Sequence, residues 1–177
     1  YVDMMGGTIT VDSRKGVGTT FTVEIPMELT NAEKVEKTKP LVQHNDLKGI
    51  KVLLAEDNDL NAELATILLE DLGMTVTRAA DGQEVVDLFA EYPAGTYDII
   101  LMDIMMPKMD GLQAAKAIRA MQAERPDAEE IPIIALSANA FAEDVQTSLD
   151  AGMNGHISKP LNVAKGAKPI ARNLNKP

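Results

Sequence analysis

The chain has 177 residues, of which 45% are apolar, and its formal charge of −10 gives a sequence pI near 4.6. This acidity argues against direct binding to nucleic acid or to an anionic membrane surface, because both depend on clustered Lys and Arg. Cysteine is absent and no apolar run approaches the roughly 20 residues of a membrane helix, which excludes disulfides and fits a cytoplasmic location.

The first predicted element is a β-hairpin between Gly7 and Met27. Apolar residues alternate with Thr on both sides of a Gly-containing loop at residues 12–18, a pattern that is typical of paired strands. The apolar positions are Ile9, Val11, Phe21, Val23 and Ile25. A lone hairpin is marginal in water, so we expect residues 1–29 to be a fragment of a larger domain. Tyr1 in place of an initiator Met also suggests an excised piece.

Residues 30–48 are predicted to be a linker. They are charged, mixed in sign and nearly free of large apolar side chains. His44 lies in this segment without a helical face or basic neighbours, so we expect it to be inert in phosphoryl chemistry.

After Gly49, strand patterns alternate with helical periodicities. The predicted strands are residues 50–55, 75–78, 97–102, 133–136 and 156–158. The predicted helical faces are Leu60, Leu64, Ile67, Leu68 and Leu72; Val85, Val86, Leu88 and Phe89; Leu112, Ala115, Ile118 and Met121; and Phe141, Val145 and Leu149. Strands separated by helices of this length predict a doubly wound α/β domain with a parallel sheet.

Polar groups follow several of these strands directly. Glu56 and Asp57 follow the first strand, Asp103 the third, Ser137 the fourth and Lys159 the fifth. Because ligands of such sheets bind at the carboxyl ends of the strands, we expect these groups to converge there.

The chemistry of this set favours phosphoryl transfer. Clustered carboxylates without His or Cys favour a hard cation, and Mg²⁺ is the one that shares its ligand sphere with phosphate oxygens. Lys159 and Ser137 suit the oxygens of a phosphoryl group, and Asp103 is the candidate nucleophile.

At this point four motifs carry a family resemblance. They are LAEDN at residues 54–58, LMDIMMPKMDG at 101–111, ALSA at 135–138 and GMNGHISKP at 152–160. In this order they closely resemble the receiver domain of bacterial response regulators. The resemblance runs from about Gly49 to Leu161, and we place the domain at residues 49–165. It implies a five-stranded sheet of flavodoxin-like order 2-1-3-4-5.

The resemblance also implies the acceptor and the metal ligands. Asp103 is expected to be phosphorylated. Glu56, Asp57, Asp103 and the backbone carbonyl of Met105 are expected to hold Mg²⁺. The implied donor is a histidine kinase phosphodonor domain or a histidine phosphotransfer protein, and the resemblance leaves room for a homodimer.

Further expectations concern the last two strands of the domain. Ser137 and Lys159 are expected to bind the phosphoryl oxygens, and the Lys159–Pro160 bond to be cis. Residues 137–149 would report the phosphorylation state. Many receivers carry Tyr or Phe as the switch aromatic where this chain has His156, so Ser137 and His156 form the candidate switch, which an imidazole could make sensitive to pH.

The hairpin has a resemblance of its own. MGGTI at residues 5–9, GVGTTF at 16–21 and IPM at 25–27 resemble the last stretch of a histidine-kinase ATP-binding domain. The implied parent is a hybrid sensor histidine kinase. The other nucleotide boxes and the phosphodonor His of that family do not occur in this sequence, so productive ATP binding by this chain is not expected.

Two departures from the receiver pattern matter. Residues 166–177 are predicted to be an irregular tail or a broken final helix, because Gly166 and Pro169 are poor helix formers. Met105 has no group that would orient a hydrolytic water, so slow loss of the phosphoryl group is expected.

Two other classes of function remain open from the sequence. One is a Mg²⁺-dependent phosphohydrolase with an aspartyl nucleophile, in which a second acid usually stands two residues after the nucleophile, where this chain has Met105. The other is an interaction module that works without phosphorylation. Repeated turnover of a phosphomonoester would favour the first, and failure of Asp103 to accept a phosphoryl group would favour the second.

Overall fold

The structure is a computed structural model that describes residues 2–16, 18–27, 47–138, 142–159, 161 and 170–174, with backbone only for 142–144. The chain divides into two compact units, Tyr1–Lys39 and Pro40–Pro177. Among the described residues, no helix has the length and apolarity that a membrane crossing requires.

The first unit contains the predicted hairpin. Strands β1 (Thr8–Arg14) and β2 (Gly18–Glu24) pair antiparallel after a short 3-10 helix, η1 (Asp3–Met5). The pairing continues to Arg14 opposite Gly18, so the connecting loop is shorter than the 12–18 predicted. Ile9 faces Val23 and Val11 faces Phe21, and all four side chains are exposed in this unit.

The second unit is built on a five-stranded parallel sheet. Its strands are β3 (Lys51–Ala55), β4 (Thr75–Ala79), β5 (Ile99–Asp103), β6 (Ile133–Ser137) and β7 (Gly155–Ser158). The strand order is β4-β3-β5-β6-β7, and every neighbouring pair is parallel. Both the doubly wound class and the order 2-1-3-4-5 are therefore confirmed.

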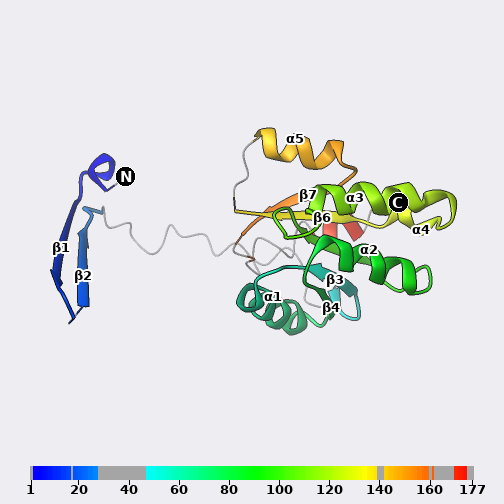
Figure 1. Cartoon of the computed structure of the whole chain (residues 1–177), viewed down its shortest axis with the longest axis horizontal. Helices are drawn as coiled ribbons and strands as arrows, with labels where there is room; N and C mark the ends of the chain where they lie inside the picture. The colour runs from blue at the N-terminus through cyan, green and yellow to red at the C-terminus, as the bar shows by residue number, and fades with distance from the viewer. Residues whose placement is uncertain are drawn as a thin grey trace, which may run out of the picture. The chain divides into compact units, whose positions relative to one another are not determined.

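One face of the sheet is covered by α2 (Gly82–Glu91) and α3 (Gly111–Ala120), with the short helices η4 (Met121–Ala123) and α4 (Asp127–Glu130) nearby. Figure 1 shows α2, α3 and α4 grouped together, apart from α1. Leu53 and Ile100 of the sheet pack here against Phe89 and Ile118 of the helices. The predicted apolar faces of these two helices are the ones that face the core.

The opposite face is covered by α1 (Asp59–Asp71) and by a helical segment at residues 170–174. Val52 and Leu54 pack on this side, as alternation along a strand requires. Leu47 and Ile170 lie just outside the predicted domain bounds of 49–165, yet both are fully buried in this layer.

The apolar face predicted for α1 is confirmed at Leu72, which is buried, but is wrong at Leu60, Leu64 and Ile67. Ala62, Ala65 and Leu69 pack against the sheet, whereas Leu60 is 74% exposed and Leu64 and Ile67 are each 50% exposed. The helix has apolar residues on two sides, and the side with small Ala residues lets the helix approach the strands closely. An apolar stripe of Leu60, Leu64 and Ile67 therefore remains on the surface.

The face predicted for the fourth helix is also incorrect at one position. In α5 (Ala142–Asp150), Leu149 is 44% exposed while its neighbour Ser148 is buried. Several other predictions fall on residues outside the described ranges: the role of His44, the place of Phe141 on the apolar face of the fourth helix, the cis bond to Pro160, and the break at Gly166 and Pro169.

Candidate phosphoacceptor and metal site

The carboxyl ends of the central strands bring the predicted polar groups to one edge of the sheet. Glu56 directly follows β3, Asp103 ends β5, Ser137 ends β6 and Lys159 directly follows β7. Backbone hydrogen bonds fix the positions of these strand ends relative to one another. Ile104 N–H donates to the Leu136 carbonyl, and Lys159 N–H donates to the Ser137 carbonyl at 2.7 Å.

Two of the acids are buried and share one ammonium group. Glu56 is 3% exposed and Asp103 is 6% exposed. Lys159 Nζ lies 2.5 Å from Glu56 Oε2 and 2.6 Å from Asp103 Oδ2. Buried ions are costly unless they are paired, so this contact compensates part of the cost of placing two carboxylates here.

Burial and pairing act in opposite directions on the pKa values of Asp103 and Lys159. Burial raises the pKa of the Asp103 carboxyl, although the hydrogen bond and the charge of Lys159 act in the opposite direction. Burial also lowers the pKa of Lys159, but its hydrogen bonds to Asp103 and Glu56 outweigh this, and the pKa is raised. Burial therefore outweighs the pairing in setting the pKa of Asp103, whereas the pairing outweighs burial in setting the pKa of Lys159.

A third acid completes a candidate cation site. Asp57 is exposed, and one carboxylate oxygen each from Glu56, Asp57 and Asp103 can be found within 4.8 Å of one another. Three clustered oxygens with a net negative charge fit a hard divalent ion such as Mg²⁺, which binds one or two carboxylates and keeps several waters. The residues present therefore fit the predicted metal.

The turn that carries Glu56 and Asp57 is held by side chains that sequence reasoning did not identify. Asn61 Nδ2 donates to Glu56 Oε1 at 3.1 Å from the first turn of α1. Arg78 of β4 donates through Nε and Nη2 to the Glu56 carbonyl and contacts Asp59 Oδ1 at 2.7 Å. Asn58, the N-cap of α1, was a visible signal for a helix start, but no pattern links Arg78 to a turn 22 residues away.

The loop after Asp103 returns to the acceptor through its backbone. Met105 N–H donates to Asp103 Oδ1 at 3.2 Å, while the Met105 side chain is 83% exposed. The loop ends at Asp110, which forms a capping box with Gln113 at the start of α3. A Cβ at Gly111 would lie 2.1 Å from the Asp103 carbonyl oxygen, so the return of the chain past the acceptor requires glycine.

Ser137 and His156 form a direct side-chain pair. Ser137 Oγ lies 2.7 Å from His156 Nε2, across the β6–β7 pair of strands. The two residues predicted as a switch are therefore brought together, at a distance typical of a short hydrogen bond.

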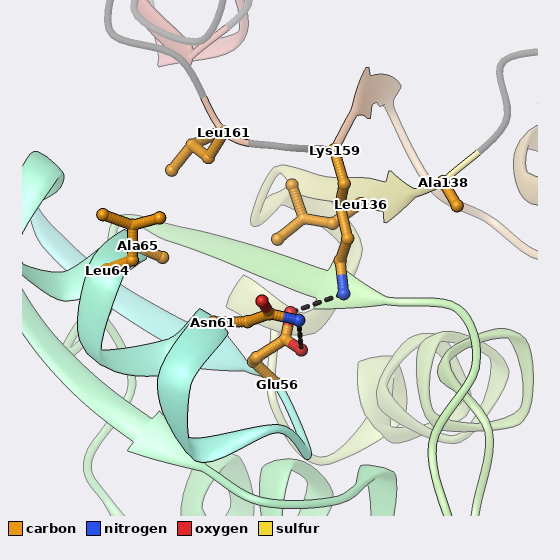
Figure 2. A pocket seen from close by; sticks show the side chains of 8 residues that line it. All are labelled: Glu56, Asn61, Leu64, Ala65, Leu136, Ala138, Lys159 and Leu161. Atoms are coloured by element: carbon orange, nitrogen blue, oxygen red, sulfur yellow. Dashed lines mark hydrogen bonds and ion pairs between the residues drawn. The ribbon is translucent and has the colours of Figure 1, made fainter. Parts of the chain in front are cut away.

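A pocket of about 280 Å³ opens beside the buried acid and Lys159 (Figure 2). In Figure 2 the Lys159 side chain reaches down to Glu56, and Asn61 approaches the same carboxylate from α1. The lining residues are Glu56, Asn61, Leu64, Ala65, Leu136, Ala138, Lys159 and Leu161. The acid site thus adjoins the surface of α1 on which Leu64 lies.

The fold and this arrangement of acids, hydroxyl and Lys define a receiver. Residues 52–171 match the family model of the response regulator receiver domain, and the chain belongs to this family. It contains a receiver domain of the two-component phosphorelay systems.

This receiver is homologous to the receiver domains of hybrid histidine kinases. The chain is 38% identical over 161 residues to the aerobic respiration control sensor protein ArcB of Escherichia coli, which covers 90% of this chain and 19% of ArcB. It is also 38% identical over 146 residues to histidine kinase 1 of Arabidopsis thaliana, which covers 66% of this chain and 12% of that protein. The chain thus spans less than a fifth of either relative.

Solved receivers have the same fold. The receiver domain of a sensor histidine kinase from Pseudomonas aeruginosa, with a magnesium ion coordinated in its active site cleft, aligns with a TM-score of 0.64 and 37% identity over 72% of this chain and 99% of that one. The receiver domain of Ssk1 from Saccharomyces cerevisiae, crystallised with the phosphotransfer protein Ypd1, aligns with a TM-score of 0.62 and 29% identity over 70% of this chain and 87% of that one.

Proposed function

We propose that Asp103 is the phosphoacceptor of this receiver. The observation that carries the proposal is the buried Asp103 carboxylate, held 2.6 Å from the Lys159 ammonium beside two further acids. In the proposed step an Asp103 oxygen attacks the phosphorus of a phosphohistidine. The P–N bond breaks as the O–P bond forms, and the departing imidazole nitrogen keeps the electron pair and takes a proton from solvent.

Glu56, Asp57, Asp103 and the backbone carbonyl of Met105 are proposed to hold Mg²⁺. When bound, the ion would neutralise charge on the transferred group, as metal ions do in phosphoryl transfer. The donor set supports this, because its carboxylates carry more negative charge than Lys159 compensates. The magnesium ion in the related Pseudomonas receiver is consistent with the same assignment.

Lys159 and Ser137 are proposed to bind the phosphoryl oxygens. Lys159 already contacts the acceptor carboxylate, so an oxygen bonded to Asp103 would lie within its reach. Ser137 Oγ would exchange its contact with His156 for one with the phosphoryl group, and this exchange is the proposed switch. The cis Lys159–Pro160 bond remains a prediction.

The donor is proposed to be a histidine phosphotransfer protein or the phosphodonor domain of a kinase. The exposed apolar stripe of Leu60, Leu64 and Ile67 on α1 supports docking of such a protein, since Leu64 also lines the pocket beside Lys159. A partner that covers this stripe would bring its phosphohistidine close to Asp103. The complex of the Ssk1 receiver with Ypd1 is a precedent for this class of partner.

The parent protein is proposed to be a hybrid sensor histidine kinase whose receiver works in the cytoplasm. The 161-residue similarity to ArcB exceeds the span of the receiver match, which supports assigning residues 1–29 to the end of a kinase ATP-binding domain. The predicted linker at residues 30–48 is shortened to residues 30–46 in this proposal, because Leu47 is buried in the receiver. Kinase activity itself would belong to parts of such a parent other than this receiver.

The phosphorylated form is proposed to be long-lived. Hydrolysis of an acyl phosphate needs an oriented water, and the exposed Met105 side chain, two residues after the acceptor, offers no hydrogen-bonding group for one. A half-life of seconds for the phosphorylated chain would contradict this.

Incubation with acetyl phosphate and Mg²⁺ tests the acceptor assignment. Intact-mass analysis should show one phosphate per wild-type chain and none on Asp103→Asn. Absence of phosphate on the wild type would overturn the proposal. Continued release of inorganic phosphate from p-nitrophenyl phosphate, without a stable labelled species, would instead identify a phosphohydrolase.

A further inference from the structure

The loop between β5 and α3, residues 104–110, is tied to the first turn of α2 at some distance from the acid cluster. Lys108 Nζ lies 2.5 Å from Asp81 Oδ2, and Gly82 N–H donates to the Met109 carbonyl at 3.1 Å. Asp81 is buried, whereas the Lys108 side chain is 75% exposed. The contact therefore joins the loop to the body of the domain from outside.

Lys108 adopts an unusual backbone conformation to make this contact. Its φ is 60°, the only positive φ of a non-glycine residue in the described part of the chain. An L-residue with a Cβ is strained in this region, while glycine is not. A lysine at this position is explained by its side chain, because a glycine would satisfy the backbone but would lose the ion pair with Asp81.

The loop has little freedom to shift between its two supports. A Cβ on Gly82 would lie 2.4 Å from the Met109 carbonyl oxygen. At the other end Gly111 passes against Asp103, and Gly111 N–H donates to the Ile104 carbonyl at 2.9 Å. The Lys108–Asp81 contact therefore acts on a segment that includes Met105, whose N–H contacts the acceptor carboxylate.

We propose that Lys108 and Asp81 are positioning residues, which fix the 104–110 loop so that the main chain of Met105 is pre-oriented at Asp103 for Mg²⁺. This inference rests on the proposed function, in which the Met105 carbonyl is a metal ligand. Neither residue contacts the reacting groups, and both act through the loop. Outer-shell groups of this kind change metal affinity because they restrict the orientations of the ligands.

Mg²⁺ affinity separates a positioning role from a purely structural one. An ion pair with an exposed Lys contributes little to global stability, so its removal should hardly change the free energy of unfolding. Asp81 has a second task as the N-cap of α2, where its Oδ1 accepts a hydrogen bond from Glu84 N–H. Asn caps helices as well as Asp does, so Asp81→Asn removes the charge and keeps the cap. The hydrogen bond from Lys108 lowers the pKa of Asp81, so the pair stays charged at neutral pH.

The test compares Lys108→Met, Asp81→Asn, the double variant and Lys108→Arg in the full chain. The first readout is Mg²⁺ affinity, measured by NMR titration with Mg²⁺ alone. The second is hydrogen exchange at the Met105 and Gly111 amides in the metal-free protein. We expect about tenfold weaker Mg²⁺ binding and faster exchange in Lys108→Met and in Asp81→Asn. The double variant should bind Mg²⁺ no more weakly than either of these two, and Lys108→Arg should retain most of the wild-type affinity.

The positioning role would be overturned if Lys108→Met and Asp81→Asn both kept a Mg²⁺ affinity within about twofold of wild type and an unchanged amide exchange. Failure of the proposed function gives a distinct result. In that case the wild type would take up no phosphate from acetyl phosphate, whatever the variants do to Mg²⁺ binding.

Discussion

The five residues of β5 are all buried, but they belong to two different regions of the molecule. Ile99 to Met102 pack among apolar side chains on the two faces of the sheet. Asp103, the last residue of the strand, instead lies among Lys159 and two other acids at the carboxyl edge. The interior and the edge are thus one residue apart in the chain, and the first buries apolar side chains while the second buries charged ones.

Stability and function reside in different parts of this fold. Interior residues stabilise the domain through removal of apolar surface from water. The edge places two buried carboxylates around one ammonium, which is unfavourable, and the proposed Mg²⁺ would compensate the excess negative charge. Functional sites commonly reduce stability in this way.

The largest effect on stability is expected in the interior. Ile100→Ala should lower the free energy of unfolding by about 3 kcal/mol, because Ile100 is fully buried and the change leaves a cavity. Urea denaturation measures the loss. The matched control is Ile67→Ala on the exposed stripe of α1, which should change stability by less than about 0.5 kcal/mol. Equal losses in the two variants would show that the burial described here is incorrect.

An intermediate loss is expected at the edge. Lys159→Met removes the cation that Glu56 and Asp103 share and should cost about 2 kcal/mol at neutral pH. Addition of Mg²⁺ should recover part of this loss, because a divalent cation would again compensate the acids. Lys116→Met, a change at an exposed position of α3, serves as the control. It should neither lower the free energy of unfolding nor make it depend on Mg²⁺. Insensitivity of the Lys159→Met variant to Mg²⁺ would argue against the cation site.

A change of the opposite sign is expected at the acceptor. Asp103→Asn should raise the free energy of unfolding by about 1 kcal/mol at neutral pH, because Lys159 keeps Glu56 as its partner and the excess negative charge is removed. The folded-state pKa of Asp103 is raised, so ionisation of this carboxyl destabilises the fold above that pKa. The advantage of Asn should therefore be complete above the raised pKa and shrink as pH falls toward 3.8, the ordinary value. Denaturation curves across this pH range measure the stability difference between the variant and wild type. An Asn variant that is less stable than wild type at neutral pH would show that ionised Asp103 does not destabilise the fold.

The smallest effect on stability is expected on the α1 stripe. Leu60→Gln should change the free energy of unfolding by less than about 0.5 kcal/mol, because Leu60 is 74% exposed. It should nevertheless slow phosphoryl transfer from a phosphorylated histidine phosphotransfer protein such as Ypd1, and slow labelling by acetyl phosphate much less. Leu149→Gln makes the same change on α5 and should leave the protein-dependent transfer unaltered. If both variants transfer like wild type, the stripe is not the docking surface.

The strands and the meeting of the acids at their carboxyl ends could be predicted, because apolar strands and their polar ends are local patterns. The order of the strands was implied only by the resemblance to receiver domains. The face of α1 could not be predicted, since Leu60, Leu64 and Ile67 satisfy the helical period as well as Ala62, Ala65 and Leu69 do. Periodicity identifies a face but does not say which of two faces meets the sheet. The exposed one proved to be the more apolar by residue type.

The side chains that support the site could not be predicted from the sequence either. Arg78 reaches the Glu56 carbonyl, and Lys108 reaches Asp81, through contacts between residues far apart in the chain. From sequence alone, a charged residue is expected to lie on the solvated surface. Its partner can be identified only when the positions of β4 and α2 beside the two loops are known. The strained φ of Lys108 likewise has no signature in the residue type.

The most direct measurement is chemical trapping of the phosphorylated residue. Borohydride reduces an aspartyl acyl phosphate to homoserine, so the chain treated with acetyl phosphate and Mg²⁺, then with borohydride, should yield a peptide with homoserine at position 103. The same treatment of Asp103→Asn should yield none. Recovery of unmodified Asp103 from a chain that carries phosphate, or homoserine at position 57 instead, would contradict the assignment of Asp103 as the acceptor.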